Sequence, residues 1–231
     1  MKKFQKTIGI IGGIGPCASL KIYARIIKRA QEKYGAVQDW EYPHVILNSV
    51  NMEGFDEKGV VDGELVSNRL VAEAIVLEKA GCDLIIMACN TIHCFLNSIE
   101  RACSIPLLNT IKITCQSVFD AGFKKVGLLC SETTSKEGLY QECCRKYGMD
   151  IMPPNDSQQK VINEVIAAVM GGSHSEKELD SLRDIVKNFL KEGVEAVIVG
   201  CTELPLVIKQ SDIDCKLFDS MDMTVIKAME A

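Results

Sequence analysis

Two stretches of the chain repeat one pattern and decide the fold class. Residues 80–91 read AGCDLIIMACNT, and residues 192–203 read EGVEAVIVGCTE. In each stretch a glycine ends a helix, a short apolar run forms a strand, and a cysteine follows the strand. The two cysteines, Cys89 and Cys201, therefore occupy equivalent positions 112 residues apart. The repeat predicts two related α/β halves, each with a thiol at the exit of a strand.

Short apolar runs alternate with amphipathic segments along the whole chain, which indicates βα units and mostly parallel sheets. The run at residues 7–11 precedes a glycine-rich turn, and the run at residues 125–129 restarts the same plan. We expect two pseudo-symmetric Rossmann-like domains, each with about four strands flanked by helices and with an active site in the cleft between them. The first domain is predicted to comprise residues 1–112 plus 210–231, and the second residues 113–209. On this division the last strand, expected at residues 216–219, returns to the first sheet.

The composition is that of a globular protein and excludes several classes. Hydrophobic residues make up 47% of the 231 residues, charged residues 25%, and the formal net charge is −5. Nucleic-acid binders usually carry a basic face, and no apolar run approaches the roughly 20 residues that span a bilayer. Eleven cysteines without a C-x-x-C pair indicate a reducing, cytoplasmic setting, and three histidines lack the spacing of a zinc site. We expect no nucleic-acid partner, no membrane contact and no metal.

The position of the two cysteines suggests chemistry, because α/β proteins bind ligands at the carboxyl ends of their strands. If each cysteine begins a helix, the free N–H groups there lower the thiol pKa from about 8.5 and can hold a carboxylate. Two thiols on opposite sides of one small molecule could remove a proton from one face of a carbon and return one to the other. The remaining cysteines are expected to pack as small apolar side chains.

Other interpretations remain open from the residues alone. Residues 13–18 match the G-x-G-x-x-A dinucleotide fingerprint, although Pro16 removes an N–H that a pyrophosphate would use. His93 lies four residues after Cys89, a spacing that allows a cysteine–histidine hydrolase. A small-ligand-binding protein without catalysis is a third class, although binding alone needs neither thiol. Glu203 and Asp219 could orient Cys201 or could be ordinary acids at helix starts.

Three motifs together resemble the aspartate/glutamate racemase superfamily, and in particular its aspartate-racemase branch. They are GIIGGIGP at residues 9–16, ACNTIH at 88–93 and GCTELP at 200–205. The resemblance implies an amino-acid racemase that needs no cofactor, forms a homodimer and moves a proton at the α-carbon with Cys89 and Cys201 as the acid/base pair. Related isomerases and decarboxylases keep one or both thiols, so such an activity stays an alternative.

The same resemblance assigns binding roles to polar residues of this chain. The α-carboxylate would be bound by Asn90, Thr91 and Thr202. The loops after the second and fifth strands and a lysine near the distal end of the substrate would contribute Asn48, Ser49, Ser131, Thr134 and Lys160.

One departure from the family pattern concerns the substrate. Acid-specific members carry an arginine after the second strand, whereas residues 49–56 here read SVNMEGFD, with two acids and no arginine. An anionic side chain would meet repulsion there unless Lys58 or Lys160 compensates. The departure argues against aspartate as the substrate and favours a broader amino-acid specificity, although the sequence does not decide which amino acid is used.

Overall fold

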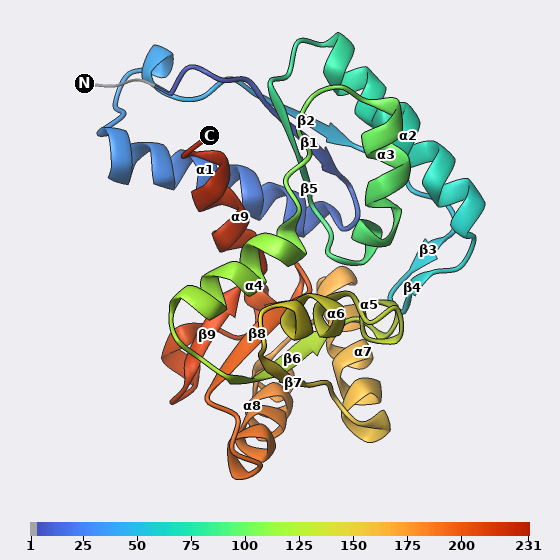
Figure 1. Ribbon diagram of the computed structural model, residues 1–231, viewed down its shortest axis with the longest axis vertical. Coiled ribbons are helices and arrows are strands. Elements are labelled where there is room, and N and C mark those ends of the chain that lie inside the picture. The colour runs from blue at the N-terminus through green and yellow to red at the C-terminus, as the bar shows by residue number, and fades with distance from the viewer. Residues whose placement is uncertain (1–3) are drawn as a thin grey trace.

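The computed structural model describes residues 4–231, which form two α/β lobes (Figure 1). The first lobe contains a parallel sheet of strand order β2-β1-β5, and the second a parallel sheet of order β7-β6-β8-β9. Helices flank both sheets. The predicted α/β class with two Rossmann-like domains is confirmed. Within the described part, no helix is both long and apolar enough to cross a bilayer.

The elements follow one another as βα units, with short 3₁₀ turns (η) at several loops. Up to residue 102 they are β1 (Ile8–Gly12), α1 (Pro16–Tyr34), η1 (Asp39–Glu41), β2 (Val45–Ser49), β3 (Phe55–Asp56), β4 (Gly59–Val60), α2 (Gly63–Lys79), β5 (Leu84–Met87), η2 (Thr91–Phe95) and α3 (Leu96–Ala102). The remaining elements are α4 (Thr110–Asp120), β6 (Lys125–Cys130), α5 (Glu132–Lys136), α6 (Leu139–Lys146), β7 (Asp150–Met152), α7 (Asp156–Met170), α8 (Glu176–Lys191), β8 (Ala196–Gly200), η3 (Leu204–Leu206), η4 (Gln210–Asp212), β9 (Lys216–Asp219) and α9 (Ser220–Ala228).

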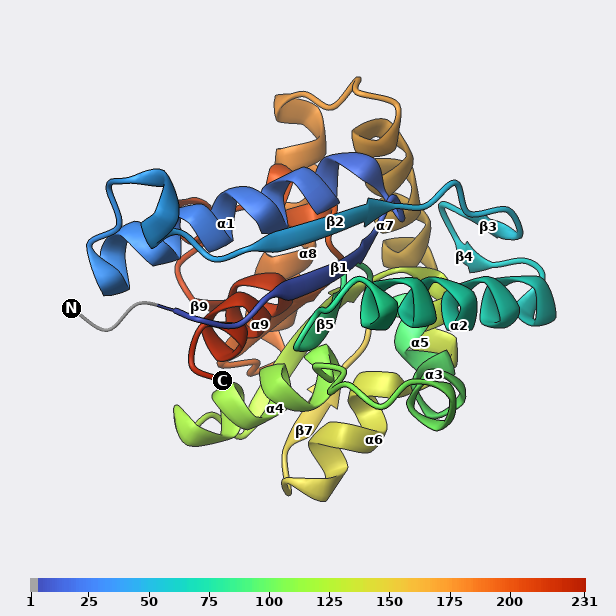
Figure 2. The same ribbon diagram turned by 90° about the horizontal axis from the view of Figure 1, so that it is seen from above.

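Both sheets are buried on two faces, which explains their continuous apolar strands. In β1, Ile10 packs with α1 and α9, whereas the next residue, Ile11, packs with α2. Figure 2 shows α1 and α2 on opposite sides of this sheet. In β6, Leu128 faces α4 and α6, and Leu129 faces α7 and α8. Successive side chains of a strand point to opposite faces, so each lobe is a three-layer sandwich.

The closing strand lies in the second sheet, so its predicted return to the first sheet is wrong. In β9, Phe218 pairs in parallel with Ile198 of β8. Its ring meets that of Phe123 edge-on, with 5.7 Å between the ring centroids. Only the 3₁₀ turns η3 and η4 separate β8 from β9, and consecutive strands usually lie side by side in one sheet. Of residues 210–231, only helix α9 packs in the core of the first lobe.

The first sheet also has fewer strands than the four or so that were predicted. The apolar segment at residues 105–109 lies at the edge of this sheet but makes only one isolated parallel bridge, between Ile85 and Leu107. In the second lobe, the pairing of β7 with β6 adds a strand that the sequence pattern did not predict. The second sheet therefore has four strands, and the first has three with a bridged edge.

Helices α4 and α9 join the two lobes. Helix α4 follows the first lobe in sequence but packs on the second sheet, for example through Ile111. Helix α9 follows the second sheet but packs on the first through Met221 and its neighbours. The two helices contact each other (Figure 1), and the buried Thr224 hydroxyl donates to the Thr110 hydroxyl at 3.0 Å. This crossed packing fixes the orientation of one sheet relative to the other.

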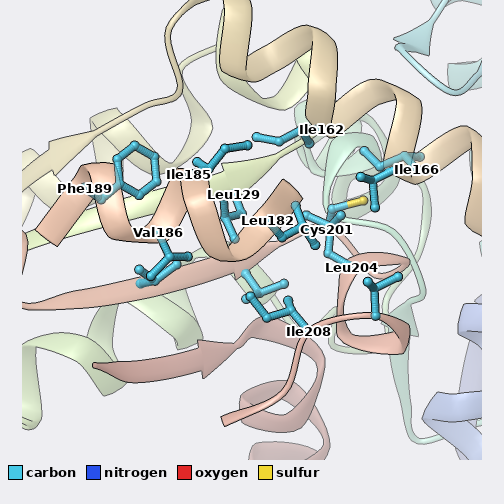
Figure 3. Packing of buried hydrophobic residues seen from close by; sticks show 14 of the residues in the cluster. Leu129, Ile162, Ile166, Leu182, Ile185, Val186, Phe189, Cys201, Leu204 and Ile208 are labelled. Carbon is cyan, nitrogen blue, oxygen red and sulfur yellow. The ribbon is translucent and has the colours of Figure 1, made fainter. Parts of the chain in front are cut away.

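Phe189 provides a test of the second core. Its ring is 1% exposed and lies in the cluster between α7, α8 and the sheet (Figure 3). We expect Phe189→Ala to lower the free energy of unfolding by about 3–5 kcal/mol, because it removes a buried ring and leaves a cavity. Denaturant unfolding measures this change. The matched control is Leu20→Ala, at a side chain that is 63% exposed, where the change should stay within about 0.5 kcal/mol. Equal losses in both variants would contradict the packing.

Candidate active site

The two equivalent cysteines line one cavity. It lies between the lobes, beyond the carboxyl ends of β1, β5 and β8, and has a volume of about 130 Å³. Cys89 follows β5 and Cys201 follows β8, and each is 7% exposed. Figure 3 shows Cys201 at one end of the apolar cluster of the second lobe, near Ile166 of α7. Two thiols that are far apart in sequence thus line one cavity.

Glu203 connects Cys201 to the opposite lobe. Its Oε2 accepts hydrogen bonds from the Cys201 thiol at 3.2 Å and from the Thr202 hydroxyl at 2.9 Å. Its Oε1 accepts from the backbone N–H of Gly15 at 3.2 Å. The carboxylate is buried and lines the cavity. Glu203 therefore orients the Cys201 sulfur, which is one of the two roles considered for it from the sequence.

Three hydroxyl groups meet across the lobes beside Cys89. Thr91 Oγ1 lies 2.8 Å from Ser131 Oγ and 3.0 Å from Thr134 Oγ1. Ser131 caps the start of α5 by accepting from the Thr134 backbone N–H. All three residues are buried, and Thr91 and Ser131 line the cavity. These two side chains offer hydroxyl groups to a ligand in the cavity.

The thiol pKa values shift upward, opposite to the prediction. Burial, then the Glu203 carboxylate, raises the pKa of Cys89 to about 12, although the backbone N–H groups of Ile92 and Thr91 act in the other direction. Burial, again followed by Glu203, also raises the pKa of Cys201 well above its usual value. Neither cysteine begins an α-helix: a 3₁₀ turn follows Cys89 and a bend follows Cys201. Removal of the thiolate from water outweighs the few amides at these turns.

Two of the predicted carboxylate ligands are engaged within the protein. The Asn90 side chain donates to the Ser220 hydroxyl at 3.0 Å and accepts from the Tyr140 hydroxyl at 2.6 Å. The Thr202 hydroxyl donates its hydrogen to the Glu203 carboxylate. Both side chains are buried beside the cavity without lining it. They position the cysteine loops, and of the three residues assigned to the carboxylate, only Thr91 faces the cavity.

Three further residues lie away from the cavity. The Asn48 side chain donates to Glu73 of α2, and Ser49, the next residue of β2, is exposed. Lys160 is exposed on α7 and lines a different depression, together with Glu132 and Asp156. None of these three side chains lines the cavity, so their role in substrate binding stays a prediction from the resemblance.

Asp219 serves the helix that it precedes. One of its oxygens, Oδ1, accepts from the Met221 backbone N–H at 2.9 Å, which caps α9, and from Arg25 Nη1 at 3.2 Å. Within residues 4–231, no hydrogen bond joins it to Cys201. The Asp219 carboxylate is therefore an acid that caps a helix, and it does not orient the Cys201 thiol.

His93 is a buried structural histidine and does not contact the Cys89 sulfur. Its Nε2 accepts from the Thr110 backbone N–H at 3.1 Å, so the proton is on Nδ1, which lies 3.0 Å from the Cys89 carbonyl. Burial lowers the pKa of His93 to about 4. A neutral ring with both nitrogens engaged cannot activate the neighbouring thiol. This geometry removes the cysteine–histidine hydrolase as an interpretation.

The glycine-rich loop after β1 forms one wall of the cavity. Its amides are already engaged: Gly13 N–H donates to Ser19 Oγ at 2.9 Å, and Gly15 N–H donates to Glu203. Gly13 has φ of +87°, and a Cβ there would meet the Val50 carbonyl oxygen at 2.2 Å. The loop therefore needs glycine to fit against Val50. A dinucleotide pyrophosphate would find no free amides at Gly13 and Gly15, which disfavours the nucleotide-binding interpretation.

A small hairpin of the first lobe covers the cavity, and the sequence analysis missed it. Strands β3 and β4 pair antiparallel and place Met52, Phe55, Asp56 and Glu57 along the wall. The turn signal was present, because Asp56 and Gly59 stand between the apolar residues Phe55 and Val60. The strands are so short that alternation gave no strand signal.

The hairpin is held shut by the second lobe. The Lys58 carbonyl accepts from the Thr133 backbone N–H at 3.0 Å and from its hydroxyl at 2.9 Å. Gly59 has φ of +126°, and a Cβ there would lie 2.3 Å from Thr133 Oγ1. Figure 1 shows β3 and β4 reaching from the first lobe to α5. These contacts fasten the hairpin to the second lobe at the wall of the cavity that both thiols line.

Comparisons with known proteins agree with this geometry. The family model of Asp/Glu/hydantoin racemases matches residues 11–228. The chain is 27% identical over 213 residues to the broad specificity amino-acid racemase RacX of Bacillus subtilis, covering 92% of each protein. Two α/β lobes with paired thiols at their interface define the class of this protein. The chain belongs to the Asp/Glu/hydantoin racemase family, a family of isomerases.

Solved structures share the whole fold. An aspartate racemase homologue from Pyrococcus horikoshii is 33% identical, with a TM-score of 0.80 and coverage of 97% of this chain and 98% of that one. The aspartate racemase of Picrophilus torridus is 25% identical, with a TM-score of 0.78 and coverage of 97% and 94%. The likeness extends over both lobes, including the interface that contains the cavity.

The raised thiol pKa predicts slow alkylation of Cys89. In the ligand-free protein, iodoacetamide should modify the exposed Cys17 first. Since the reactive species is the thiolate, the rate at Cys89 should rise about tenfold per pH unit from about pH 7.5 to 9.5 without a plateau. Peptide mass spectrometry measures both rates. A plateau below pH 9 at Cys89, in a protein that is still folded, would show a lowered thiol pKa instead.

The environment of His93 predicts a neutral ring across the physiological range. Its folded pKa of about 4 lies below the value of about 6.5 expected in an unfolded chain. Between these values the unfolded state binds the extra proton, so the free energy of unfolding decreases as the pH falls through this window. NMR of labelled histidine should show no His93 titration above about pH 5, and titration near 6.5 in concentrated urea. A native midpoint near 6.5 would contradict the assigned hydrogen bonds.

Proposed function

We propose that the protein is a cofactor-independent amino-acid racemase in which Cys89 and Cys201 act as the two acid/base groups. The observation that carries the proposal is that both thiols line one cavity of about 130 Å³ from equivalent positions of the two lobes. A single carbon held between them can exchange protons on either face. In this mechanism one thiolate takes the α-proton and the other thiol gives a proton to the opposite face. One C–H bond breaks and one forms, so the reaction needs no redox partner.

Substrate binding supplies a positive charge that the side chains of the cavity do not provide. With a thiol pKa near 12, Cys89 is protonated at neutral pH in the ligand-free protein. An amino-acid zwitterion brings an α-ammonium group into the cavity, and a nearby cation favours the thiolate. The same ammonium group increases the acidity of the α-proton. The Cys89 proton passes to bulk water as the substrate enters, so thiolate formation is linked to occupancy of the site, and the hairpin then excludes water from the charged intermediate state.

Polar groups around Cys89 stabilise negative charge on the substrate. The hydroxyls of Thr91 and Ser131 face the cavity and can donate to the α-carboxylate. The backbone N–H groups of Thr91 and Ile92 point to the Cys89 sulfur and favour its anionic form. Charge that develops on the carboxylate as the α-proton leaves is then met by donors already in place.

Glu203 sets the state of the second thiol. Because its carboxylate accepts the Cys201 hydrogen at 3.2 Å, it keeps Cys201 protonated and aimed. In the direction in which Cys89 takes the α-proton, Cys201 is therefore the acid, and in the reverse direction the two cysteines exchange these roles. After proton transfer the Cys201 thiolate faces the Glu203 carboxylate, and this repulsion favours its return to the thiol.

Two alternative functions give different products. A decarboxylase on the same scaffold would release carbon dioxide and leave no chiral amino acid. A binding protein would gain thermal stability from an amino acid without exchanging its α-proton. Incubation with L- and D-amino acids in deuterium oxide, followed by chiral chromatography and mass spectrometry, separates all three. Deuterium at the α-carbon of both enantiomers is the expected result.

Removal of either thiol tests the mechanism. We expect Cys89→Ala and Cys201→Ala each to lower kcat for racemisation by at least about 10³-fold in both directions, because each enantiomer needs one base and one acid. The rate of interconversion is measured by optical rotation or by chiral chromatography, with each enantiomer in turn as the substrate.

The matched control is Cys17→Ala, which removes an exposed thiol outside the cavity. It should keep parental turnover. Near-parental racemisation by either cavity variant, in both directions, would show that the two-thiol assignment is wrong.

A further inference from the structure

The cavity carries negative charge without a compensating cation. Its lining includes the carboxylates of Asp56, Glu57 and Glu203. Within residues 4–231, no lysine, arginine or histidine lines it. A substrate with a second carboxylate would therefore meet only acids at its side chain.

Two of these three carboxylates already have partners. Asp56 Oδ1 accepts from the backbone N–H groups of Lys58 at 2.8 Å and Gly59 at 3.2 Å, which shapes the hairpin turn. Glu203 accepts from Cys201, Thr202 and Gly15. The Glu57 carboxylate has no hydrogen bond or ion pair with any other described residue. It is half-buried at the tip of the hairpin and remains free to pair with a ligand.

The two lysines that could neutralise this acid lie elsewhere. Lys58 is exposed, and its charge acts on Glu132 of α5, where it adds to the larger effect of Lys136 in lowering the pKa of that carboxyl. Lys160 lines the separate depression beside Glu132. The compensation that would admit an acidic substrate is therefore missing from the cavity.

The rest of the wall near the hairpin is apolar. Met52 and Phe55 come from the hairpin segment, and Ile166 and Met170 come from α7. Hydrocarbon on both sides suits the methylene stem of a long side chain, which gains from burial while its charged end stays polar. Glu57 follows Phe55 and Asp56 on the hairpin and lines the same cavity as the two thiols, so its carboxylate is available to the charged end of such a side chain.

We propose that Glu57 selects amino acids with a cationic group on an aliphatic stem, the class of lysine, ornithine and arginine, and that dicarboxylic amino acids are poor substrates. This rests on the proposed racemase function and specifies its substrate class. Attraction at Glu57 favours the cation, whereas repulsion from Glu57 and Asp56 disfavours a second carboxylate. Neutral aliphatic amino acids fall between the two.

The test compares kcat/KM for L-lysine, L-methionine and L-glutamate by α-deuterium exchange. The parent protein should follow that order. Glu57→Gln should lower the lysine-to-methionine ratio about tenfold, and Glu57→Lys should raise the glutamate-to-methionine ratio by a similar factor. The control is Glu53→Gln, which removes an exposed acid of the same segment that does not line the cavity, and both ratios should stay at parental values.

Failure of this inference is distinct from failure of the racemase. If glutamate is the best substrate of the parent, or if Glu57→Gln leaves the lysine-to-methionine ratio unchanged, the selection by Glu57 is wrong while the racemase stands. If no amino acid exchanges its α-proton in the folded parent protein, the proposed function itself is wrong. Thermal unfolding of each variant confirms that the compared proteins are folded.

Discussion

The crossed packing of α4 and α9 is the constraint on which the site depends. Each helix leaves the lobe that precedes it in sequence and joins the core of the other, and the buried hydroxyls of Thr110 and Thr224 bond where they meet. The lobes therefore share two apolar cores across their boundary rather than touching along a surface. This packing turns the carboxyl ends of both sheets toward each other, and the thiols that follow β5 and β8 meet in one cavity as a result.

Desolvation dominates the electrostatics of this cavity. The turn amides after Cys89 favour a thiolate, yet burial and the Glu203 carboxylate together act more strongly in the opposite direction. This burial favours the thiol form of both sulfurs. The thiols are thereby protected from alkylation and oxidation when no substrate is present, because both reactions require the thiolate.

Much of the architecture could be predicted from strand and helix periodicity, and the paired cysteines from the repeat at residues 80–91 and 192–203. Prediction failed where local sequence does not decide the outcome. The pairing of β9 depends on which of the two sheets the chain reaches after β8. Asn90 and Thr202 are polar residues beside the thiols, and only the structure shows that Tyr140, Ser220 and Glu203 already engage them. The sign of the thiol pKa shift depends on burial, which spacing along a chain does not report.

The hairpin is attached to the second lobe through its own main chain: the Lys58 carbonyl accepts from Thr133, and the Val60 N–H donates to the Thr133 hydroxyl. Substitution of Glu57, whose carboxylate makes no hydrogen bond to the other described residues, therefore leaves this attachment intact. Within such a scaffold, evolution can exchange the residue at position 57 while closure and the thiol chemistry stay constant. New substrate preferences can then arise by single substitutions at the tip while the hairpin keeps its contact with the second lobe.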